Sequence, residues 1–255
     1  MIISFLKEND EFENRSMLLP EHIAPIVKLG FKIFIENDYA KKLNIDDQLY
    51  QNLGAEIKSA NDICSQSDVI VKISGKDLKS HNFKENSVII TGFFDKSNED
   101  LVSLKNNKKL EIFGLNYLPR ITRAQAMDVL SSQSNLAGYK AVIDATSEYK
   151  KAIPMMMTAA GTIAPAKIFI MGVGVAGLQA IATARRLGGI VTATDVRPAT
   201  KEQVESLGAK FIAVEDDEFK AAETSAGYAK EMSKEYQEKQ SQLISDHIKN
   251  QDIVI

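Results

Sequence analysis

The strongest constraint on the fold is a strand–turn–helix–strand pattern at residues 166–195. An apolar run at 168–171 predicts a buried parallel strand. Gly172, Gly174 and Gly177 follow with G-x-G-x-x-G spacing, and the Ala-rich segment 178–187 predicts a helix ended by two glycines. Residues 190–194 predict the next strand. Such a glycine motif is weak evidence alone, but in this order it predicts a dinucleotide-binding β-α-β unit.

Each glycine in this turn has a physical role. Gly172 permits a tight turn, Gly174 lets the backbone approach a pyrophosphate, and Gly177 lets the helix pack closely on the strand. The helix N-terminus adds unpaired N–H groups and the positive end of its dipole. We therefore predict cofactor contacts along the whole turn: Gly172, Val173, Gly174, Val175, Ala176 and Gly177.

An acid at the end of the second strand predicts the choice of cofactor. A carboxylate at Asp195 can accept the hydroxyls of an adenosine ribose and disfavours a 2′-phosphate, which favours NAD over NADP. Val196 and Arg197 extend this predicted contact. Arg197 either contacts the cofactor or pairs with Glu202 or Glu205, and the sequence leaves both open.

Composition excludes several other classes of protein. The 255 residues include 44% hydrophobic and 25% charged residues with a net charge of −3, which gives no reason to expect nucleic-acid binding. The single cysteine, Cys64, excludes an intrachain disulfide and is interpreted as a small buried hydrophobe. The histidines are far apart, so no metal site is predicted: His22, His81 and His247.

No segment has the pattern of a targeting or membrane-spanning sequence. The apolar start is interrupted by charges from Lys7 onward, too early for a signal peptide. The weakly polar stretch 152–166 contains two prolines and is too short to span a bilayer. We therefore expect membrane association only through a partner.

Alternating apolar and helical segments predict a fold class of α/β with two Rossmann-like parallel-sheet domains. In the first half, strands are expected at 2–6, 31–36, 68–73, 87–92 and 110–113, and helices at 21–29, 39–52 and 98–106. Residues 122–149 lack proline and predict one long helix of about 42 Å, interrupted at most by Gly138. We place the domain boundary inside it, near Asn135, giving domains 1–135 and 136–255.

After Asp195 the pattern continues with alternating elements. We expect a helix at 198–207, a strand at 208–214, a mobile loop at 215–227, a helix at 228–250 and a strand from 252. In the strand order 3-2-1-4-5-6 this supplies strands 1 to 4 of the second sheet. The second domain is therefore expected to be incomplete.

Short polar side chains recur in the predicted long helix. Gln125, Asp128 and Ser131 are spaced by three and are expected to share a face, which Asn135 continues. Such a stripe is ordinarily a solvated face. Amide, hydroxyl and acid groups in place of Lys and Glu, however, suit hydrogen bonding to a neutral carboxamide.

Three segments resemble one protein family. They are PRITRAQAMDVLSSQSNLAGYKAVIDA (119–145), MGVGVAGLQAIATARRLGGIVTATDVRPATKEQVESLGAKF (171–211) and AGYAKEM (226–232). In these segments the chain resembles the NAD(H)-binding part of the alpha subunit of proton-translocating NAD(P) transhydrogenases, and the resemblance extends over essentially the whole chain. It departs in its degenerate N-terminal stretch, LKENDEFENRSMLLP, and because the family continues beyond the DIVI strand.

This resemblance implies roles for particular residues. Arg120, Gln125, Asp128 and Ser131 would surround the nicotinamide ring and its carboxamide, and Tyr228 would lie on a loop that closes over the nucleotide. Without the resemblance, the favoured interpretation of Tyr228 is a half-buried helix anchor. These residues would orient the ring, so no catalytic acid or base is expected.

The resemblance also implies a reaction and partners. Hydride would pass between NADH bound here and NADP⁺ bound on a beta subunit, coupled to proton translocation through a membrane-domain polypeptide. A homodimer is implied, as is a cytoplasmic position, peripheral at the inner (plasma) membrane through the partner subunits.

Two alternatives stay open. Alanine dehydrogenases share the fold, and Arg15 and Lys72 are candidates for a substrate carboxylate clamp, but the expected catalytic histidine is absent from segment 90–101. The other alternative is a non-catalytic NAD-binding or assembly fragment, suggested by the expected incomplete sheet.

Overall fold

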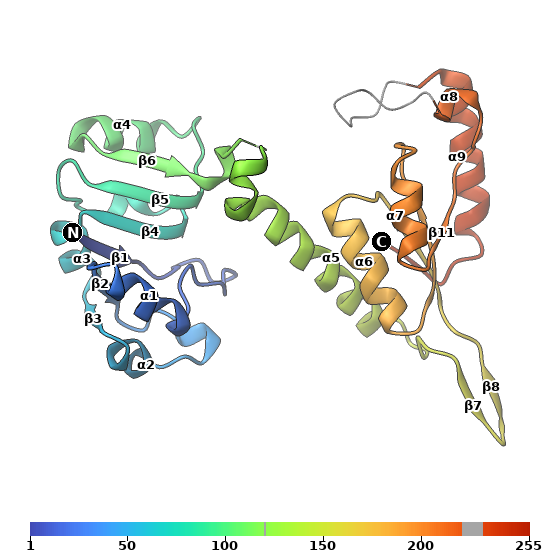
Figure 1. Cartoon of the computed structure of the whole chain (residues 1–255), viewed down its shortest axis with the longest axis horizontal. Coiled ribbons are helices and arrows are strands. Elements are labelled where there is room, and N and C mark those ends of the chain that lie inside the picture. The colour runs from blue at the N-terminus through green and yellow to red at the C-terminus, as the bar shows by residue number, and fades with distance from the viewer. Residues whose placement is uncertain (120, 221–231) are drawn as a thin grey trace. The chain divides into compact units, whose positions relative to one another are not determined.

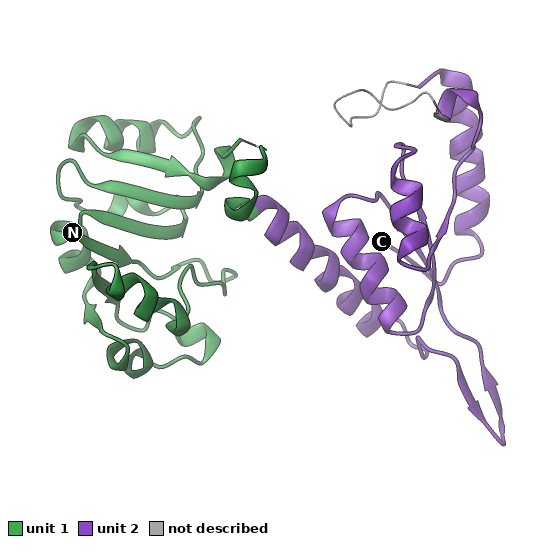
Figure 2. Cartoon of the chain, in the orientation of Figure 1, with its two compact units in different colours: residues 1–129 green, residues 130–255 purple. Residues whose placement is uncertain are grey.

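The computed structural model describes residues 1–119, 121–220 and 232–255. It divides into two compact units, residues 1–129 and 130–255 (Figure 2). This division falls six residues before the boundary expected from the sequence.

Unit 1 is built on a parallel sheet of six strands in the order β3-β2-β1-β4-β5-β6 (Figure 1). The strands are β1 (Ile2–Phe5), β2 (Lys32–Glu36), β3 (Ala55–Lys58), β4 (Val69–Ser74), β5 (Val88–Phe93) and β6 (Glu111–Gly114). The helices are α1 (Ile23–Lys28), α2 (Asp47–Asn52), α3 (Ala60–Gln66) and α4 (Glu99–Lys108). Short 3₁₀ helices are η1 (Pro20–His22), η2 (Lys41–Leu43), η3 (Leu78–Ser80), η4 (Leu115–Tyr117) and η5 (Thr122–Met127).

Alternation along the strands gives unit 1 a core on each face of its sheet. In β2, Ile33 and Ile35 pack with Tyr50 on one face, whereas Phe34 packs with Ile63 on the other. All five of these side chains are buried. Helices α2, α3 and α4 begin at side-chain caps, as at Ser59, whose hydroxyl accepts the N–H of Asp62.

Unit 2 has a smaller parallel sheet in the order β11-β10-β9-β12. Its strands are β9 (Lys167–Met171), β10 (Ile190–Thr194), β11 (Lys210–Phe211) and β12 (Ile253–Val254). Its helices are α5 (Val129–Glu148), which begins on the last residue of unit 1, α6 (Val175–Arg186), α7 (Thr200–Ser206), α8 (Asp217–Lys220) and α9 (Lys234–Ile248). A separate antiparallel hairpin joins β7 (Met156–Thr158) to β8 (Gly161–Ile163).

The predicted parallel α/β class is confirmed, but several elements differ from expectation. The expected helix 122–149 is split into η5 and α5, and the expected strand 208–214 shrinks to β11. The expected helix 39–52 becomes η2 and α2. The last helix begins at Lys234 within the described residues. No helix in the described parts of the chain is both long and apolar enough to cross a membrane.

Candidate functional site

The glycine turn between β9 and α6 has a backbone that requires glycine at two positions. Gly172 has a φ of +98°, and its N–H donates to the carbonyl oxygen of Thr194 at 2.9 Å. This bond ties the turn to the end of β10. A Cβ atom at Gly177 would lie 1.8 Å from the carbonyl oxygen of Gly172. The helix therefore packs on the turn only because residue 177 has no side chain.

Gly174 has a different role. It is the N-cap of α6, with φ −81° and ψ −167°, and no side chain caps the helix. A Cβ atom there would meet no atom within 4 Å. The first N–H groups of α6 lack intrahelical partners, and the space in front of Gly174 is open. This arrangement fits the close approach of a pyrophosphate to the backbone.

Asp195 is tied to the same turn by its carboxylate. Its Oδ2 accepts the Val173 N–H at 2.8 Å, and its Oδ1 accepts both the main-chain N–H and the Nε–H of Arg197 at 2.9 Å. Nη2 of Arg197 donates to Oδ2 and to the carbonyl oxygen of Val173, both at 3.1 Å. Asp195 and Arg197 thus bracket the backbone of Val173 next to the predicted phosphate position.

The hydrogen bonds from Val173 and Arg197 also keep the carboxylate of Asp195 charged. Burial of the Asp195 carboxyl, whose side chain is 8% exposed, would raise its pKa. The hydrogen bonds from Arg197 and from the Val173 N–H outweigh burial and lower the pKa of Asp195. Asp195 is therefore an anion that can accept hydrogen bonds, but both of its oxygens already have donors. Ribose hydroxyls would have to share or displace them.

The sequence left two roles open for Arg197, and the structure gives it a third. Its guanidinium pairs with Asp195 rather than with Glu202 or Glu205. Glu202 and Glu205 lie on α7, whereas Asp195 lies two positions before Arg197 at the end of β10, within 2.9 Å of its Nε. Val196, between them, is exposed.

Helix α9 supplies supporting residues that the sequence did not single out. Nε2 of Gln240 donates to Thr194 Oγ1 at 3.2 Å, and Oε1 of Gln240 accepts the Val214 N–H at 2.8 Å. Gln240 thereby links the end of β10, beside Asp195, to the segment after β11. In a helix rich in Lys, Glu and Gln, no signal distinguishes this glutamine from its solvated neighbours.

The residues predicted for the nicotinamide side are placed only in part. Arg120 and Tyr228 lie outside the described residues. Gln125 is in η5 and Asp128 is its C-cap, both in unit 1, whereas Ser131 is in the first turn of α5 in unit 2. Asp128 has ψ 87°, far from the helical value, so the expected continuous helix face is wrong. The roles of these five residues stay predictions.

Helix α5 packs closely against the first turn of α6. Gly138 is buried, and a Cβ atom there would lie 2.0 Å from the carbonyl oxygen of Ala176, in the first turn of α6. Further along, Nδ2 of Asn135 donates to Oε1 of Gln179 at 3.2 Å. The glycine that the sequence suggested as an interruption of the helix is therefore the point where α5 crosses α6.

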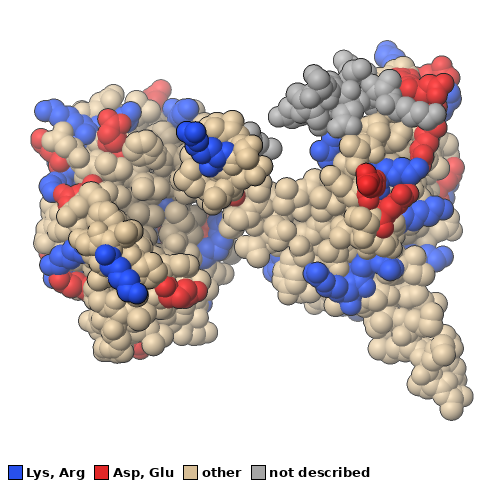
Figure 3. Space-filling model, viewed as in Figure 1, with Lys and Arg blue, Asp and Glu red and all other residues tan. Residues whose placement is uncertain are grey.

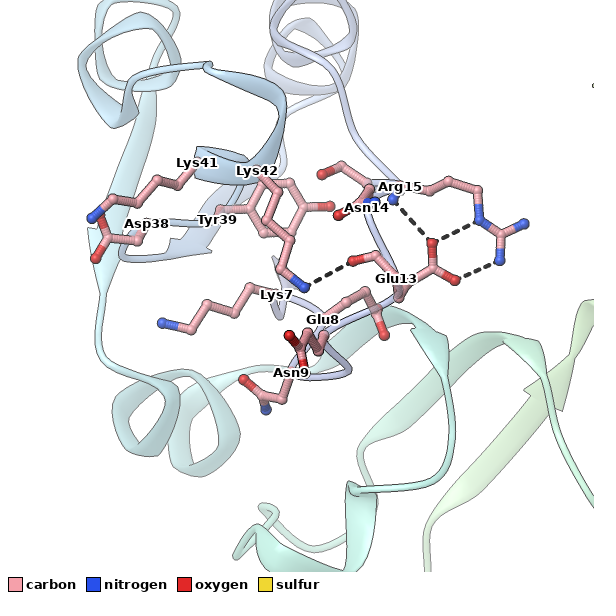
Figure 4. A pocket seen from close by; sticks show the side chains of 12 residues that line it. Lys7, Glu8, Asn9, Glu13, Asn14, Arg15, Asp38, Tyr39, Lys41 and Lys42 are labelled. Atoms are coloured by element: carbon pink, nitrogen blue, oxygen red, sulfur yellow. Dashed lines mark hydrogen bonds and ion pairs between the residues drawn. The ribbon is translucent and has the colours of Figure 1, made fainter. Parts of the chain in front are cut away.

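In unit 1 the two candidate clamp residues are already paired with acids. Figure 4 shows a pocket of about 460 Å³ in which Arg15 turns toward Glu13: Nε donates to Oε1 at 2.8 Å and Nη2 to Oε2 at 2.5 Å. Lys72 is 1% exposed and donates to the carbonyl oxygen of Lys7. Its Nζ also lies 3.7 Å from Glu8 Oε2 and 3.3 Å from Asp77 Oδ2.

Glu8 is also hydrogen-bonded to the end of strand β4. Its Oε1 accepts the Ile73 N–H at 2.7 Å and its Oε2 accepts the Ser74 N–H at 3.2 Å. Burial raises the pKa of Glu8, and the nearby Lys72 opposes that rise. The described residues contain no cluster of His, Cys, Asp and Glu able to hold a metal ion.

Comparison with known proteins covers both units. Residues 4–137 match the family described as alanine dehydrogenase/PNT, N-terminal domain, and residues 141–255 match alanine dehydrogenase/PNT, C-terminal domain. The chain is 45% identical over 262 aligned positions to an NAD(P) transhydrogenase alpha-subunit polypeptide of Rhodospirillum rubrum, covering all of this chain and 68% of that protein.

A solved structure and a more distant relative complete the comparison. The crystal structure of transhydrogenase from Sinorhizobium meliloti superposes with a TM-score of 0.86 at 48% identity, covering all of this chain and 68% of that one. Alanine dehydrogenase of Staphylococcus saprophyticus is 25% identical, over 81% of this chain and 56% of that protein. The transhydrogenase likeness is the stronger of the two in identity and coverage.

Proposed function

Because the chain belongs to the alanine dehydrogenase/PNT family, through both of its domains, we propose that it is the NAD(H)-binding component of a proton-translocating NAD(P) transhydrogenase. Its homology to transhydrogenase alpha subunits makes it a component of an oxidoreductase. One observation supports a nucleotide site: the N-terminus of α6 is open at Gly174, and the charged Asp195 lies beside it.

The chain's own residues bind and orient the nucleotide. The N–H groups in the first turn of α6 would receive the pyrophosphate, since they lack intrahelical partners and the space at Gly174 is open. Asp195 would accept the ribose hydroxyls by exchanging one of its present donors, and Arg197 would keep its carboxylate ionised and in place. Gln125, Asp128, Ser131, Arg120 and Tyr228 are proposed to hold the nicotinamide, on the strength of the family resemblance.

The reaction needs positioning rather than acid–base chemistry. Bound NADH supplies a hydride, and NADP⁺ on a partner subunit accepts it. The residues named above would hold the ring at roughly 3–3.5 Å from its acceptor and exclude water. No side chain of this chain is required to move a proton in the hydride step, which agrees with the orienting roles proposed for Asp128 and Arg120.

We propose that the partners are a beta subunit carrying the NADP(H) site and a membrane-domain polypeptide. The chain would then lie on the cytoplasmic side and reach the membrane through these subunits. Homology to an alpha subunit of a multisubunit transhydrogenase supports this arrangement.

An alanine dehydrogenase activity is not favoured. A clamp for a substrate carboxylate needs cations that are available, but Arg15 is held by Glu13, and Lys72 is buried against Glu8 and Asp77. Segment 90–101 also has no histidine to serve as acid or base.

The proposal is tested by titrating the 255-residue chain with NADH, followed by nucleotide fluorescence, with NADPH as the competing ligand. We expect saturable NADH binding, weaker NADPH binding, and a loss of roughly tenfold or more in NADH affinity in Asp195→Ala, since charge-assisted hydrogen bonds are lost. Asp68→Ala is a matched control: Asp68 also accepts a backbone N–H at 2.8 Å and a lysine at 2.6 Å, but in unit 1.

The second stage measures hydride transfer after adding the NADP(H)-binding partner. Transfer that tracks NADH binding across the variants would support the transhydrogenase proposal. NADH binding with no transfer would instead support the non-catalytic alternative. A folded wild-type chain that binds neither nucleotide would contradict the proposed role of the glycine turn.

A further inference from the structure

Strand β10, which ends beside Asp195, carries two polar side chains in a buried position. Thr192 is 9% exposed and Thr194 is 7% exposed. Val191 and Ala193, which alternate with them, belong to the apolar core of unit 2. Because side chains alternate along a strand, the two threonines share the other face of β10. A buried hydroxyl costs free energy unless it is hydrogen-bonded, so this face needs polar partners.

Helix α9 supplies a partner for each threonine. Nε2 of Gln240 donates to Thr194 Oγ1 at 3.2 Å. Two helical turns later, Nε2 of His247 lies 2.8 Å from Thr192 Oγ1. One side of α9 therefore lies along β10, and Gln240 meets the strand next to Asp195. The other side of the helix is charged: Figure 3 shows both signs of charge along the edge of unit 2 where α9 runs.

The amide of Gln240 has a defined orientation. Its Oε1 accepts the Val214 N–H at 2.8 Å, and a peptide N–H can only donate. The amide oxygen must therefore face Val214, which leaves the amide N–H group for Thr194. Tyr236, one turn earlier on α9, donates its hydroxyl to the Val214 carbonyl oxygen at 3.1 Å. Because α9 holds both backbone groups of Val214, Gln240 contacts Thr194 from a fixed position.

Thr194 connects α9 to the glycine turn. Its hydroxyl accepts the hydrogen bond from Gln240, and its carbonyl oxygen accepts the Gly172 N–H at 2.9 Å. The next residue, Asp195, accepts the Val173 N–H with its carboxylate. The helix, the strand end and the turn are therefore linked through one residue. This link sets the spacing between the acid and the glycine turn.

The position of Asp195 depends most on this link when a nucleotide binds. Both oxygens of its carboxylate already have donors, so a ribose hydroxyl must share or displace one of them. The backbone at the end of β10 then has to keep the carboxylate within reach of the ribose. Hydrogen bonds of this kind are about 2.5–3.2 Å long and weaken when they are stretched. A small displacement of the strand end would therefore weaken the ribose contact.

We propose that Gln240 is a positioning residue of the nucleotide site: through Thr194, it holds the end of β10 so that Asp195 meets the hydroxyls of the adenosine ribose. The inference rests on the proposed NAD(H)-binding function and adds a residue that acts through Thr194 and Asp195. It gives two similar contacts different roles. The contact of Gln240 serves nucleotide affinity, whereas that of His247 with Thr192 serves only the attachment of the helix.

Thr194→Val and Thr192→Val in the 255-residue chain form a matched pair for the test. Each removes one buried hydroxyl with a partner on α9 and keeps a β-branched side chain. Urea unfolding should therefore shift both midpoints by a similar amount. In NADH titrations followed by nucleotide fluorescence, we expect the dissociation constant to rise roughly three- to tenfold in Thr194→Val, and by less than about twofold in Thr192→Val. Thr194→Ser keeps the hydroxyl and should bind NADH as the wild-type chain does.

Two further measurements test the route of the effect. Gln240→Met should raise the NADH dissociation constant as Thr194→Val does. The double variant should raise it no further, because both substitutions remove the same contact. An NADH analogue with a 2′,3′-dideoxy adenosine ribose has no hydroxyl for Asp195 to accept. All of these chains should therefore bind that analogue with the wild-type affinity.

The possible failures separate this inference from the proposed function. Equal weakening of NADH binding in the two threonine variants would show a general loosening of β10 and overturn the inference. Unchanged NADH affinity in folded Gln240→Met and Thr194→Val, or the same loss of affinity for the dideoxy analogue, would overturn it as well. Each of these results leaves NADH binding by the wild-type chain standing. A folded wild-type chain that binds no NADH would overturn the proposed function and this inference together.

Discussion

Two glycines of the same motif serve different physical needs. Gly177 is excluded from carrying a side chain by the protein itself, because the carbonyl oxygen of Gly172 occupies the position of its Cβ. Gly174 is not: its φ of −81° suits any residue, and the space around it is open. Folding does not require the absence of a side chain at Gly174, and the proposed nucleotide site would account for it.

This difference predicts that stability and affinity separate at the two positions. Gly177→Ala should lower the free energy of unfolding by roughly 1–3 kcal/mol through overpacking. Gly174→Ala should change it by no more than about 0.5 kcal/mol, yet weaken NADH binding, because its methyl group enters the pyrophosphate position. Urea unfolding and NADH titration of both variants check this. A Gly174→Ala chain that binds NADH as tightly as wild type would argue against the site.

Residue spacing predicted the glycine turn but not the partners of its side chains. The spacing of the three glycines and of the acid at the strand end is set along the chain itself, so it can be read from the sequence. The pairing of Arg197 with Asp195 depends on how the chain turns after β10, and the link from Gln240 to Thr194 joins residues 46 apart. Neither has a signature in local sequence.

At the scale of elements, the length of one helix was predicted wrongly from the sequence. A proline-free, Ala-containing stretch from Thr122 favours continuous helix, but the structure has 3₁₀ helix up to Met127, and Asp128 has a non-helical ψ. Aspartate hydrogen-bonds readily to nearby backbone and favours caps and turns over helix interiors. Strand β11 is likewise shorter than expected. An apolar run in a sequence indicates that residues are buried, but not how many of them pair with a neighbouring strand.

Gly138 illustrates how packing overrides helix propensity. In an isolated helix, Gly138→Ala would gain about 1 kcal/mol. Here we expect a net loss of roughly 1–3 kcal/mol, because the new Cβ would overlap the carbonyl oxygen of Ala176 in α6. Ala137→Gly on the exposed side of α5 is the control, with an expected loss of about 1 kcal/mol. Urea unfolding followed by circular dichroism measures both. If Gly138→Ala were the stabilised variant, α5 would not pack on α6 as described.

Helix α9 is attached to the sheet through a histidine. His247 Nε2 and Thr192 Oγ1 are 2.8 Å apart, and the imidazole packs edge-on against Phe169 at 4.8 Å between ring centroids. Burial, and then the charge of Lys210, lower the pKa of His247. The folded state therefore binds this proton less readily than the unfolded state does.

The sign of the pH effect follows from that shift. The unfolded chain protonates His247 near pH 6.5, so the contribution is constant above that value, and stability is lost as the pH falls from about 6.5 toward the lower folded pKa. We expect the midpoint of thermal unfolding to fall between pH 7 and pH 5, and to fall less in His247→Gln. Comparing the two chains cancels the other titrating groups. Equal slopes would show that His247 does not contribute.

At the scale of the molecule, each unit has its own core. The buried clusters of unit 1 and unit 2 share no residue among those described. We therefore expect two unfolding transitions by calorimetry. Ile70→Ala should lower the transition of unit 1 and Ile168→Ala that of unit 2, each by roughly 2–5 kcal/mol of unfolding free energy. A single transition shifted equally by both substitutions would mean that the units unfold together.

The two units share a parallel topology but differ where a nucleotide would bind. The sheet order of unit 1 is the dinucleotide-binding order 3-2-1-4-5-6, and a ligand in such a sheet sits between the ends of strands 1 and 4. After β1, however, the chain has Lys7 and Glu8 instead of a glycine turn. The carboxylate of Glu8 covers the N–H groups of Ile73 and Ser74 at the end of β4.

Unit 1 thus supplies its own anion at the place where a phosphate would bind. At the end of the unit 1 sheet this position is filled by the carboxylate of Glu8, whereas the corresponding space at Gly174 in unit 2 is open. Each polypeptide should accordingly take up one dinucleotide, and its occupancy should follow the concentration of NAD(H) as a simple hyperbola with a stoichiometry of one.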